Sequence, residues 1–264
     1  MRKEHGDYFS ISVAGDPEGL PDNIEEVEGG VDALTHAEKR RARVAIDKTT
    51  GKEIVTVCRD PVWEIEMKYL KEKADAGAQF IILQMPLDPQ VYMDYVKACK
   101  DWGIDIPVVS GIMCLNTFGG LERMTELCKT RLPPGLMEEA RAANTTDDAF
   151  KAWGMGAGVK MCRAVLDGGA PGLHFYTLNL ERVVVGTLLG LGKITPEQVA
   201  ACQTGDADAK SMVSAQGITT GTKARPQLAG NKPLSEVDPT MAALVQDEKA
   251  RQMRCIELIA SENF

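Results

Sequence analysis

The sequence lacks the patterns that would assign it to several large classes of protein. Its seven cysteines form no CxxC pair, no GxGxxG follows a predicted strand, and no GxxxxGK[ST] occurs. These absences argue against a Rossmann dinucleotide site or a P-loop. The scattered cysteines without a CxxC pair favour reduced, mostly buried thiols over the alternative of a metal or disulfide framework.

A basic excess and a long apolar run are also missing. Thirty basic and 38 acidic residues give a formal charge of −8, so a broad basic surface for nucleic acid is not expected. The most apolar run, Val183 to Gly192, is shorter than the ~20 residues of a membrane span. The first fifteen residues contain no continuous apolar segment that would act as a secretory signal. We therefore expect a cytoplasmic protein without nucleic-acid or membrane partners.

The three histidines, His5, His36 and His174, are far apart in the sequence and none belongs to a zinc-type pair. No metal site is therefore expected. His174 lies on a predicted strand, where a role as a hydrogen-bonding residue of the core or of a pocket wall is the commoner outcome.

Strands and helices alternate along most of the chain. A helix over 61–78 is predicted from Ile65, Tyr69, Leu70 and Ala74 at helical spacing, and it leads into the strand "QFIILQMP". Three further strands are predicted, namely "YFSISVAG", "IPVVSGIM" and "GLHFYTL", each with a following loop or helix.

Strands separated by helices require crossover connections, so the sheet should be parallel, with strands buried on both faces. The spacing fits a doubly wound sheet or a (β/α)8 barrel equally well. In both architectures ligands bind beyond the carboxyl ends of the strands. The loops of interest therefore follow Gly15, Gln84, Met113 and Leu178.

Three polar residues before and after the strand "QFIILQMP" are candidates for function. Gln84 ends an apolar strand, where its amide could bind a heterocycle or could simply hold a loop. Asp88 is favoured as the N-cap of the next helix. Lys73, near the end of the preceding helix, could meet a phosphate, although a solvated lysine is commoner.

Three segments depart from the alternating pattern. Residues 23–60 are charged and weakly patterned, and are predicted to be an insertion with a short helix and a hairpin. Residues 196–232 are rich in small residues, which indicates a linker after one amphipathic turn. Residues 233–264 begin a new apolar-periodic helix, a helical carboxyl-terminal extension.

Residues 7–195 resemble the C-terminal half of the catalytic barrel of the methylenetetrahydrofolate reductase family. The blocks that carry the resemblance are "ISVAGDPEGLPD", "YLKEKADAGAQFIILQ", "IPVVSGIM", "RMTELCKTRLP" and "PGLHFYTLNLE". The resemblance implies a (β/α)8 TIM-barrel fold, of which the last four βα units are present. It also implies that FAD carries a hydride from NADH or NADPH to methylenetetrahydrofolate, giving methyltetrahydrofolate.

The resemblance also implies site residues. Gln84 matches the family glutamine that contacts flavin and folate, and Lys73 matches a basic residue near the flavin phosphates. The family glutamate lies in the first four strands, which have no counterpart before Tyr8, so no catalytic residue is assigned. The chain departs from the family at Asp16, Leu20, Leu83 and Leu180, where tyrosine, histidine, threonine and arginine are usual.

Residues 233–264 resemble the N-terminus of serine hydroxymethyltransferase, a pyridoxal-phosphate enzyme that makes methylenetetrahydrofolate, and end in "RCIELIASENF". We therefore expect a folate reductase that acts within a larger or fusion enzyme of one-carbon and methionine metabolism. The alternative is an inactive half-barrel that serves as an interaction or regulatory subunit. Four strands cannot close a barrel, so a homo-oligomer or a complementing barrel half is the expected protein partner.

Overall fold

A computed structural model describes residues 6, 10–47, 50–204, 239–240 and 243. The chain divides into two compact units, residues 1–209 and 210–264. The elements below belong to the first unit. The segment predicted to resemble serine hydroxymethyltransferase lies almost wholly outside the described residues, so that resemblance stays a prediction.

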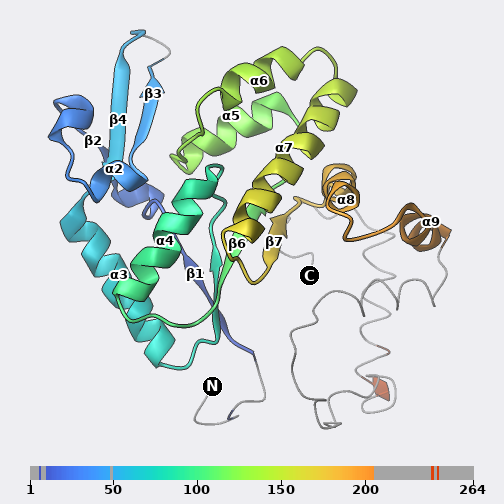
Figure 1. Ribbon diagram of the computed structural model, residues 1–264, viewed down its shortest axis with the longest axis horizontal. Helices are drawn as coiled ribbons and strands as arrows, with labels where there is room; N and C mark the ends of the chain where they lie inside the picture. The colour runs from blue at the N-terminus through green and yellow to red at the C-terminus, as the bar shows by residue number, and fades with distance from the viewer. Residues whose placement is uncertain (1–5, 7–9, 48–49, 205–238, 241–242, 244–264) are drawn as a thin grey trace. The chain divides into compact units, whose positions relative to one another are not determined.

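A four-stranded parallel sheet forms the centre of the first unit, in the order β1-β5-β6-β7 (Figure 1). Its neighbouring strands pair Gly15 with Leu83, Ile82 with Val109, and Met113 with Tyr176. The α/β fold with a parallel sheet is therefore confirmed. The strands are β1 (Ser12–Gly15), β5 (Phe80–Leu83), β6 (Val108–Met113) and β7 (Leu173–Tyr176).

Helices connect and follow the strands. Threonine and aspartate side chains cap three of them, since Asp88, Thr117 and Thr146 each accept a hydrogen bond from a backbone N–H of the first turn. The capping role predicted for Asp88 is thus confirmed. The helices are α3 (Asp60–Asp75), α4 (Pro89–Asp101), α5 (Phe118–Leu127), α6 (Leu136–Ala143), α7 (Asp147–Asp167), α8 (Glu181–Gly190) and α9 (Pro196–Thr204).

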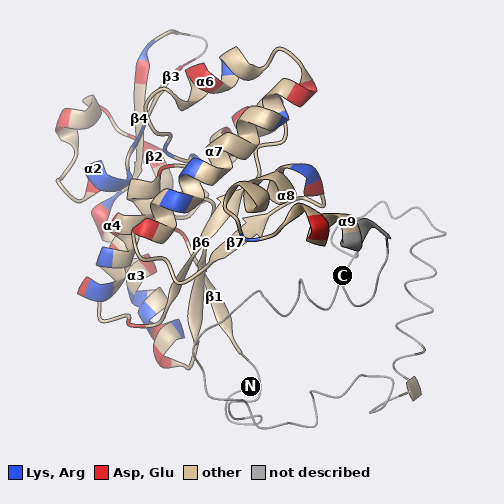
Figure 2. Ribbon diagram, turned by 45° about the vertical axis from the view of Figure 1, so that its right-hand side comes forward, with Lys and Arg blue, Asp and Glu red and all other residues tan. Residues whose placement is uncertain are grey.

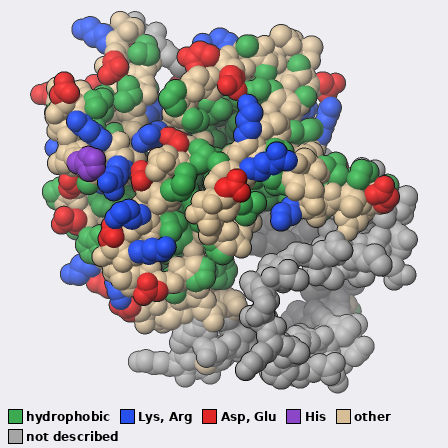
Figure 3. Space-filling view, viewed as in Figure 1, with side chains coloured by type: hydrophobic (Ala, Val, Ile, Leu, Met, Phe, Trp, Pro, Cys, Tyr) green, Lys and Arg blue, Asp and Glu red, His purple; other side chains and the backbone are tan. Residues whose placement is uncertain are grey.

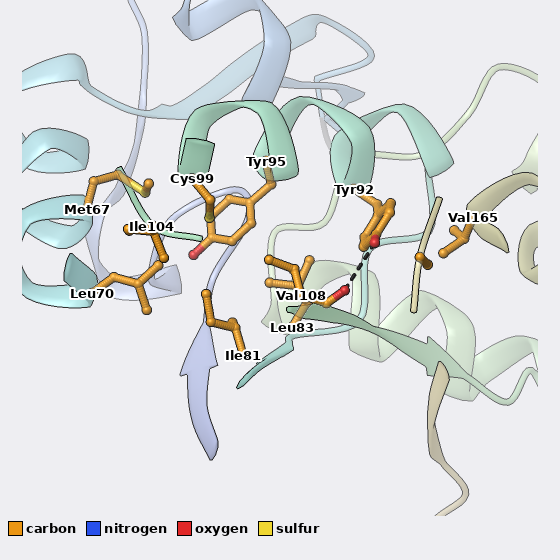
Figure 4. Close-up of a cluster of buried hydrophobic side chains, with 11 residues drawn as sticks. Met67, Leu70, Ile81, Leu83, Tyr92, Tyr95, Cys99, Ile104, Val108 and Val165 are labelled. Carbon is orange, nitrogen blue, oxygen red and sulfur yellow. Dashed lines mark hydrogen bonds between the residues drawn. The ribbon is translucent and has the colours of Figure 1, made fainter. Parts of the chain in front are cut away.

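The main core lies between one face of the sheet and helices α3, α4 and α7 (Figure 4). Ile81 and Leu83 point from β5 towards Tyr95 and Cys99 of α4, and the buried Tyr92 hydroxyl donates to the Val108 carbonyl at 3.1 Å. Met67, Leu70, Val165 and other members complete the cluster. Burial of this apolar surface is the main stabilisation of the sheet.

The buried stripe of α3 differs from the predicted one. Leu70 is buried and Ala74 packs against the core, as predicted, together with Met67, whereas Ile65 and Tyr69 are 68% and 60% exposed. The prediction is therefore confirmed for two of its four residues, and the buried stripe runs through Met67 instead of Ile65 and Tyr69.

The second face of the sheet is open in the described part of the unit. Ser12, Ala14 and His174 are exposed and lie on this face, because they alternate with residues that pack against the helices. The prediction of strands buried on both faces is therefore wrong for this sheet. His174 is not a core residue; its ring packs edge-on against Tyr176 at a centroid distance of 4.7 Å.

Residues 21–58 form a separate layer beside the parallel sheet. They contain a three-stranded antiparallel sheet in the order β2-β4-β3, with its own core of Leu34, Ala42, Val55 and Val57. This confirms a short helix and a hairpin within the predicted insertion. The elements are η1 (Pro21–Asn23), β2 (Ile24–Glu26), η2 (Gly30–Ala33), α2 (Glu38–Arg41), β3 (Arg43–Ile46) and β4 (Glu53–Cys58).

The described thiols match the expectation for reduced cysteine. Cys58, Cys99, Cys114 and Cys162 are free and buried, and Cys128 is half-buried. Burial raises the pKa of Cys99 to about 12, which keeps this thiol protonated at neutral pH. Separately, no described helix combines the length and the apolar character needed to cross a membrane.

Candidate active site at the carboxyl ends of the strands

The loop after β1 is held against helix α3 by one carboxylate. Glu66 accepts hydrogen bonds from the Leu20 backbone N–H at 3.3 Å and from the Asn23 side-chain amide at 2.7 Å. Gly19, whose φ is +97°, lets the loop pass close to Cys58, because a β-carbon there would lie 2.4 Å from the Cys58 β-carbon. The loop is therefore fixed beside the helix.

A pocket of about 290 Å³ opens between this loop and α3. Asp16, Leu20, Glu66, Tyr69 and Lys73 are among its lining residues, and Tyr95 and Trp63 form part of its wall. The Lys73 ammonium lies 4.7 Å from the centroid of the Tyr69 ring, a cation–π contact. The structure thus places Lys73 at a pocket beside the carboxyl end of β1.

The electrostatics of the pocket are mixed. Burial raises the pKa of Asp16, the nearby Glu66 carboxylate raises it further, and Lys73 lowers it. Two carboxylates therefore share the pocket with one ammonium group, and Asp16 holds a proton more tightly than a solvated aspartate.

Gln84 follows β5 at the same edge of the sheet. Its backbone N–H donates to the Gly15 carbonyl at 2.9 Å, next to Asp16. The residue is half-buried, and no described residue makes a hydrogen bond with its side-chain amide. Gln84 does not line the Lys73 pocket, so the structure does not bring the two predicted residues into one pocket, although Gln84 is bonded to Gly15 and Gly15 lines that pocket.

A close contact between strands shapes the surface next to Gln84. A β-carbon on Gly111 would lie 2.3 Å from the Leu83 carbonyl oxygen and 2.8 Å from the Tyr176 ring. The Tyr176 hydroxyl donates to the same Leu83 carbonyl at 3.3 Å. Because Gly111 has no side chain, the Tyr176 ring can lie across β6 and its hydroxyl can reach Leu83, the residue before Gln84.

A buried ionic cluster lies behind the loop and was not predicted. Glu18, 6% exposed, accepts a hydrogen bond from the Arg131 backbone N–H, and the Arg131 side chain pairs with Asp88 at 3.0 Å. Burial raises the pKa of Glu18 to about 8. Glu18 stands in a loop of proline, glycine and acidic residues, where the sequence reads as solvated, so no local signal identifies it as buried.

The pocket lining does not fit a flavin dinucleotide by its charge. The resemblance implies FAD, whose phosphates require cations or backbone donors. Lys73 is the one cationic side chain among the described lining residues, and it shares the pocket with the carboxylates of Asp16 and Glu66. The volume, about 290 Å³, also lies at the lower bound of roughly 300 Å³ for small-molecule pockets. No chemical step is therefore assigned to a flavin on these residues.

Comparison with known proteins gives the family. The family model described as methylenetetrahydrofolate reductase matches residues 1–192. A probable methylenetetrahydrofolate reductase (NADH) of Oryza sativa is 34% identical over 76% of this chain and 29% of its own length. A probable NADPH enzyme of Caenorhabditis elegans is 29% identical over 75% of this chain and 25% of its own length. This chain thus spans less than a third of either relative, and it belongs to the methylenetetrahydrofolate reductase family.

Proposed function

We propose that the chain takes part in the reduction of 5,10-methylenetetrahydrofolate to 5-methyltetrahydrofolate with NADH or NADPH. The family membership supports an oxidoreductase of this class, and the names of the two relatives supply the nicotinamide cofactors. Because the chain spans 29% of the length of the rice relative, the complete activity is proposed for an assembly in which further polypeptide supplies the rest of the site.

The observation that carries the proposal is the position of Gln84. Ligands of parallel sheets bind beyond the carboxyl ends of the strands, and Gln84 stands at that end of β5 with a side-chain amide that no described residue satisfies. An amide both donates and accepts, which suits the mixed donor and acceptor edge of a pterin. Gln84 would hold and orient the folate.

Lys73 has a separate part in the proposal. Its ammonium group lies beside the β1 loop and would neutralise a phosphate or carboxylate of a ligand that enters the pocket. FAD enters the proposal through the resemblance alone. Asp16 stands where the resemblance expects an aromatic ring, so this chain offers a carboxylate where the family offers a stacking surface.

A second role is favoured by the open face of the sheet. Ser12, Ala14 and His174 are exposed there, and β1 and β7 are the outer strands of the described sheet. We propose as the alternative an inactive half-barrel that pairs with a second copy or with a complementing barrel half.

The test that separates the two roles is flavin retention by the purified chain. The chain is incubated with FAD, freed of unbound flavin by gel filtration, and its visible spectrum is recorded. A flavin band retained by the chain together with a complementing barrel half, followed by formation of 5-methyltetrahydrofolate from the methylene substrate and NADH, supports the reductase role. A folded chain that retains no flavin alone or with a second barrel half, and sediments as a dimer, supports the alternative.

A further inference from the structure

A groove separates the β3–β4 hairpin from the α5–α6 pair, away from the Gln84 and Lys73 positions. Its volume is about 500 Å³. One wall consists of all four residues of β3, Arg43 to Ile46, and the other comes from α5, the loop that follows it, and α6. Figure 3 shows hydrophobic side chains on both sides of the hollow between the hairpin and these helices.

The strand that lines the groove is an edge strand. β3 pairs on one side with β4 and has no described strand on its other side. Asp47 donates its N–H to the Lys52 carbonyl at 2.8 Å, and this pair continues the register in which Ala45 faces Ile54. Hydrogen-bonded pairs alternate in an antiparallel ladder, so the backbone N–H and C=O groups of Val44 and Ile46 point away from β4.

Nothing in the described part of the chain satisfies these outward groups. No described residue makes a backbone hydrogen bond to Val44 or Ile46 from the groove side. Their side chains are 50% and 63% exposed. Proteins usually protect such an edge with proline, an inward charge, a bulge or a covering element. The Val44–Ile46 segment carries none of these, so it is a ready template for another strand.

The size of the groove limits what can fill it. A strand rises about 3.3 Å per residue, lies about 4.8 Å from its neighbour and packs in layers about 10 Å apart, so one residue needs roughly 160 Å³. The 500 Å³ of the groove therefore hold about three residues of a single strand. A hairpin from a second copy of this chain is too wide, because it would bring two strands.

The charges of the groove indicate the side chains of the occupant. Glu122, Glu126 and Glu138 line the helical wall together with Arg141, which gives that wall a formal charge of −2. Burial lowers the pKa of Arg43 and the nearby Glu126 carboxylate raises it, which places carboxylate charge on the Arg43 side of the sheet. The opposite side of the edge presents the apolar side chains of Val44 and Ile46.

We propose that this groove binds an extended segment of a partner polypeptide, which adds to β3 as a fourth strand of the β2-β4-β3 sheet. The segment carries β-branched residues on the Val44–Ile46 side and lysine or arginine on the side of the carboxylates. Backbone hydrogen bonds to Val44 and Ile46 give the affinity, and the alternating side chains give the specificity.

The experiment measures binding of a labelled peptide of three valine-lysine repeats to the full chain by fluorescence anisotropy. In a strand, alternate N–H groups point to the same edge. One peptide is therefore methylated at the valine amides and a second at the lysine amides. We expect saturable binding of the unmethylated peptide, a loss of at least tenfold for one methylated peptide, and little loss for the other. No saturable binding, or equal binding of all three peptides, overturns the proposal.

Protein variants locate the site. Val44→Pro removes one outward N–H without removing a bond to β4, a position at which edge strands tolerate proline. We expect it to weaken peptide binding at least tenfold, with Val44→Thr as the matched control that stays within about threefold. Slowed amide hydrogen exchange at Val44 and Ile46 on peptide addition provides a readout that does not depend on any variant. Unchanged exchange at both amides, with the peptide at saturation, contradicts the proposal.

Discussion

Gln84 donates its backbone N–H to the Gly15 carbonyl oxygen at 2.9 Å, and this bond continues the β1–β5 ladder beyond the last residue pair of the two strands. The residue after β5 is therefore fixed at the carboxyl edge of the sheet. The backbone of Gln84 is held there by this bond, while its side-chain amide makes no hydrogen bond with a described residue. An amide that is fixed in place and lacks a described partner is suited to a ligand.

The close approach of β5 and β6 should make Gly111 intolerant of any side chain. We expect Gly111→Ala to lower the free energy of unfolding by about 3 kcal/mol, because its β-carbon would lie 2.3 Å from the Leu83 carbonyl oxygen, a backbone atom that cannot move aside. Urea denaturation measures the change.

A second glycine supplies the control for this experiment. Gly156 lies in α7, and a β-carbon there would meet no other atom within 4 Å. Gly156→Ala should raise the free energy of unfolding by about 0.5–1 kcal/mol, since alanine favours the helix. Equal effects of the two substitutions would contradict the packing described for Gly111.

The stability of the chain should depend on pH through Glu18. Its pKa is about 8 in the folded chain and 4.5 for an ordinary glutamate, so between these values the folded state holds a proton that the unfolded state has lost. Stability from this group is present below pH 4.5 and falls as the pH rises towards 8, by at most about 1.4 kcal/mol per pH unit.

The variant Glu18→Gln isolates that contribution. We expect the difference in unfolding free energy between wild type and Glu18→Gln to fall steadily from pH 5 to pH 8, measured by urea denaturation at each pH. Glu122→Gln, at a partly exposed residue of α5, serves as the control. A difference that does not change with pH would show that Glu18 is not buried in its neutral form.

The charge of the Lys73 pocket should control flavin binding. Asp16→Tyr removes one of the two carboxylates that face Lys73 and restores the aromatic ring expected from the resemblance. We expect this variant, and more so the double variant with Leu20→His, to retain at least tenfold more FAD after gel filtration than wild type. Asp22→Asn, an exposed residue of the same loop, should leave flavin retention unchanged. Equal retention by all variants would remove this pocket from the flavin site.

The buried hydroxyl of Tyr92 should contribute to stability through its bond to β6. Tyr92→Phe leaves the Val108 carbonyl without its 3.1 Å side-chain donor, so we expect a loss of about 1–2 kcal/mol in the free energy of unfolding. Tyr69→Phe, at a side chain 60% exposed, should change stability by less than about 0.5 kcal/mol. Thermal or urea unfolding of both variants makes the comparison.

Much of the architecture could be predicted from local patterns. The four strands and the capped helices follow from apolar runs and from residues such as Asp88, whose effects extend over one helical turn. Helix α6 is absent from the prediction. Its eight residues lie between a Pro-Pro-Gly sequence and a polar run, and the whole segment is typical of one long loop. Charges in the described helices are interspersed in sign, as Figure 2 shows, and give no local signal of a site.

The unpredicted features depend on contacts between distant residues. The buried Glu18 accepts a hydrogen bond from the backbone of Arg131, 113 residues away, and the exposure of His174 depends on what covers the second face of the sheet. Neither the burial of Glu18 nor the exposure of His174 can be predicted from the spacing of apolar residues along the sequence. For the candidate site, the place of Gln84 at the carboxyl end of β5 follows from the predicted strand. Lys73, in the last turn of α3, comes near the carboxyl end of β1 only through the way α3 packs on the β1 loop.

The central claim is that Gln84 binds the folate, and calorimetric titration of the purified chain with 5-methyltetrahydrofolate tests it most directly. We expect saturable binding by wild type, at least tenfold weaker binding by Gln84→Ala, and unchanged binding by Gln79→Ala, at the opposite end of the same strand. If wild type does not bind the folate, or if Gln84→Ala binds it as tightly as wild type does, the site proposed at the carboxyl end of β5 is wrong.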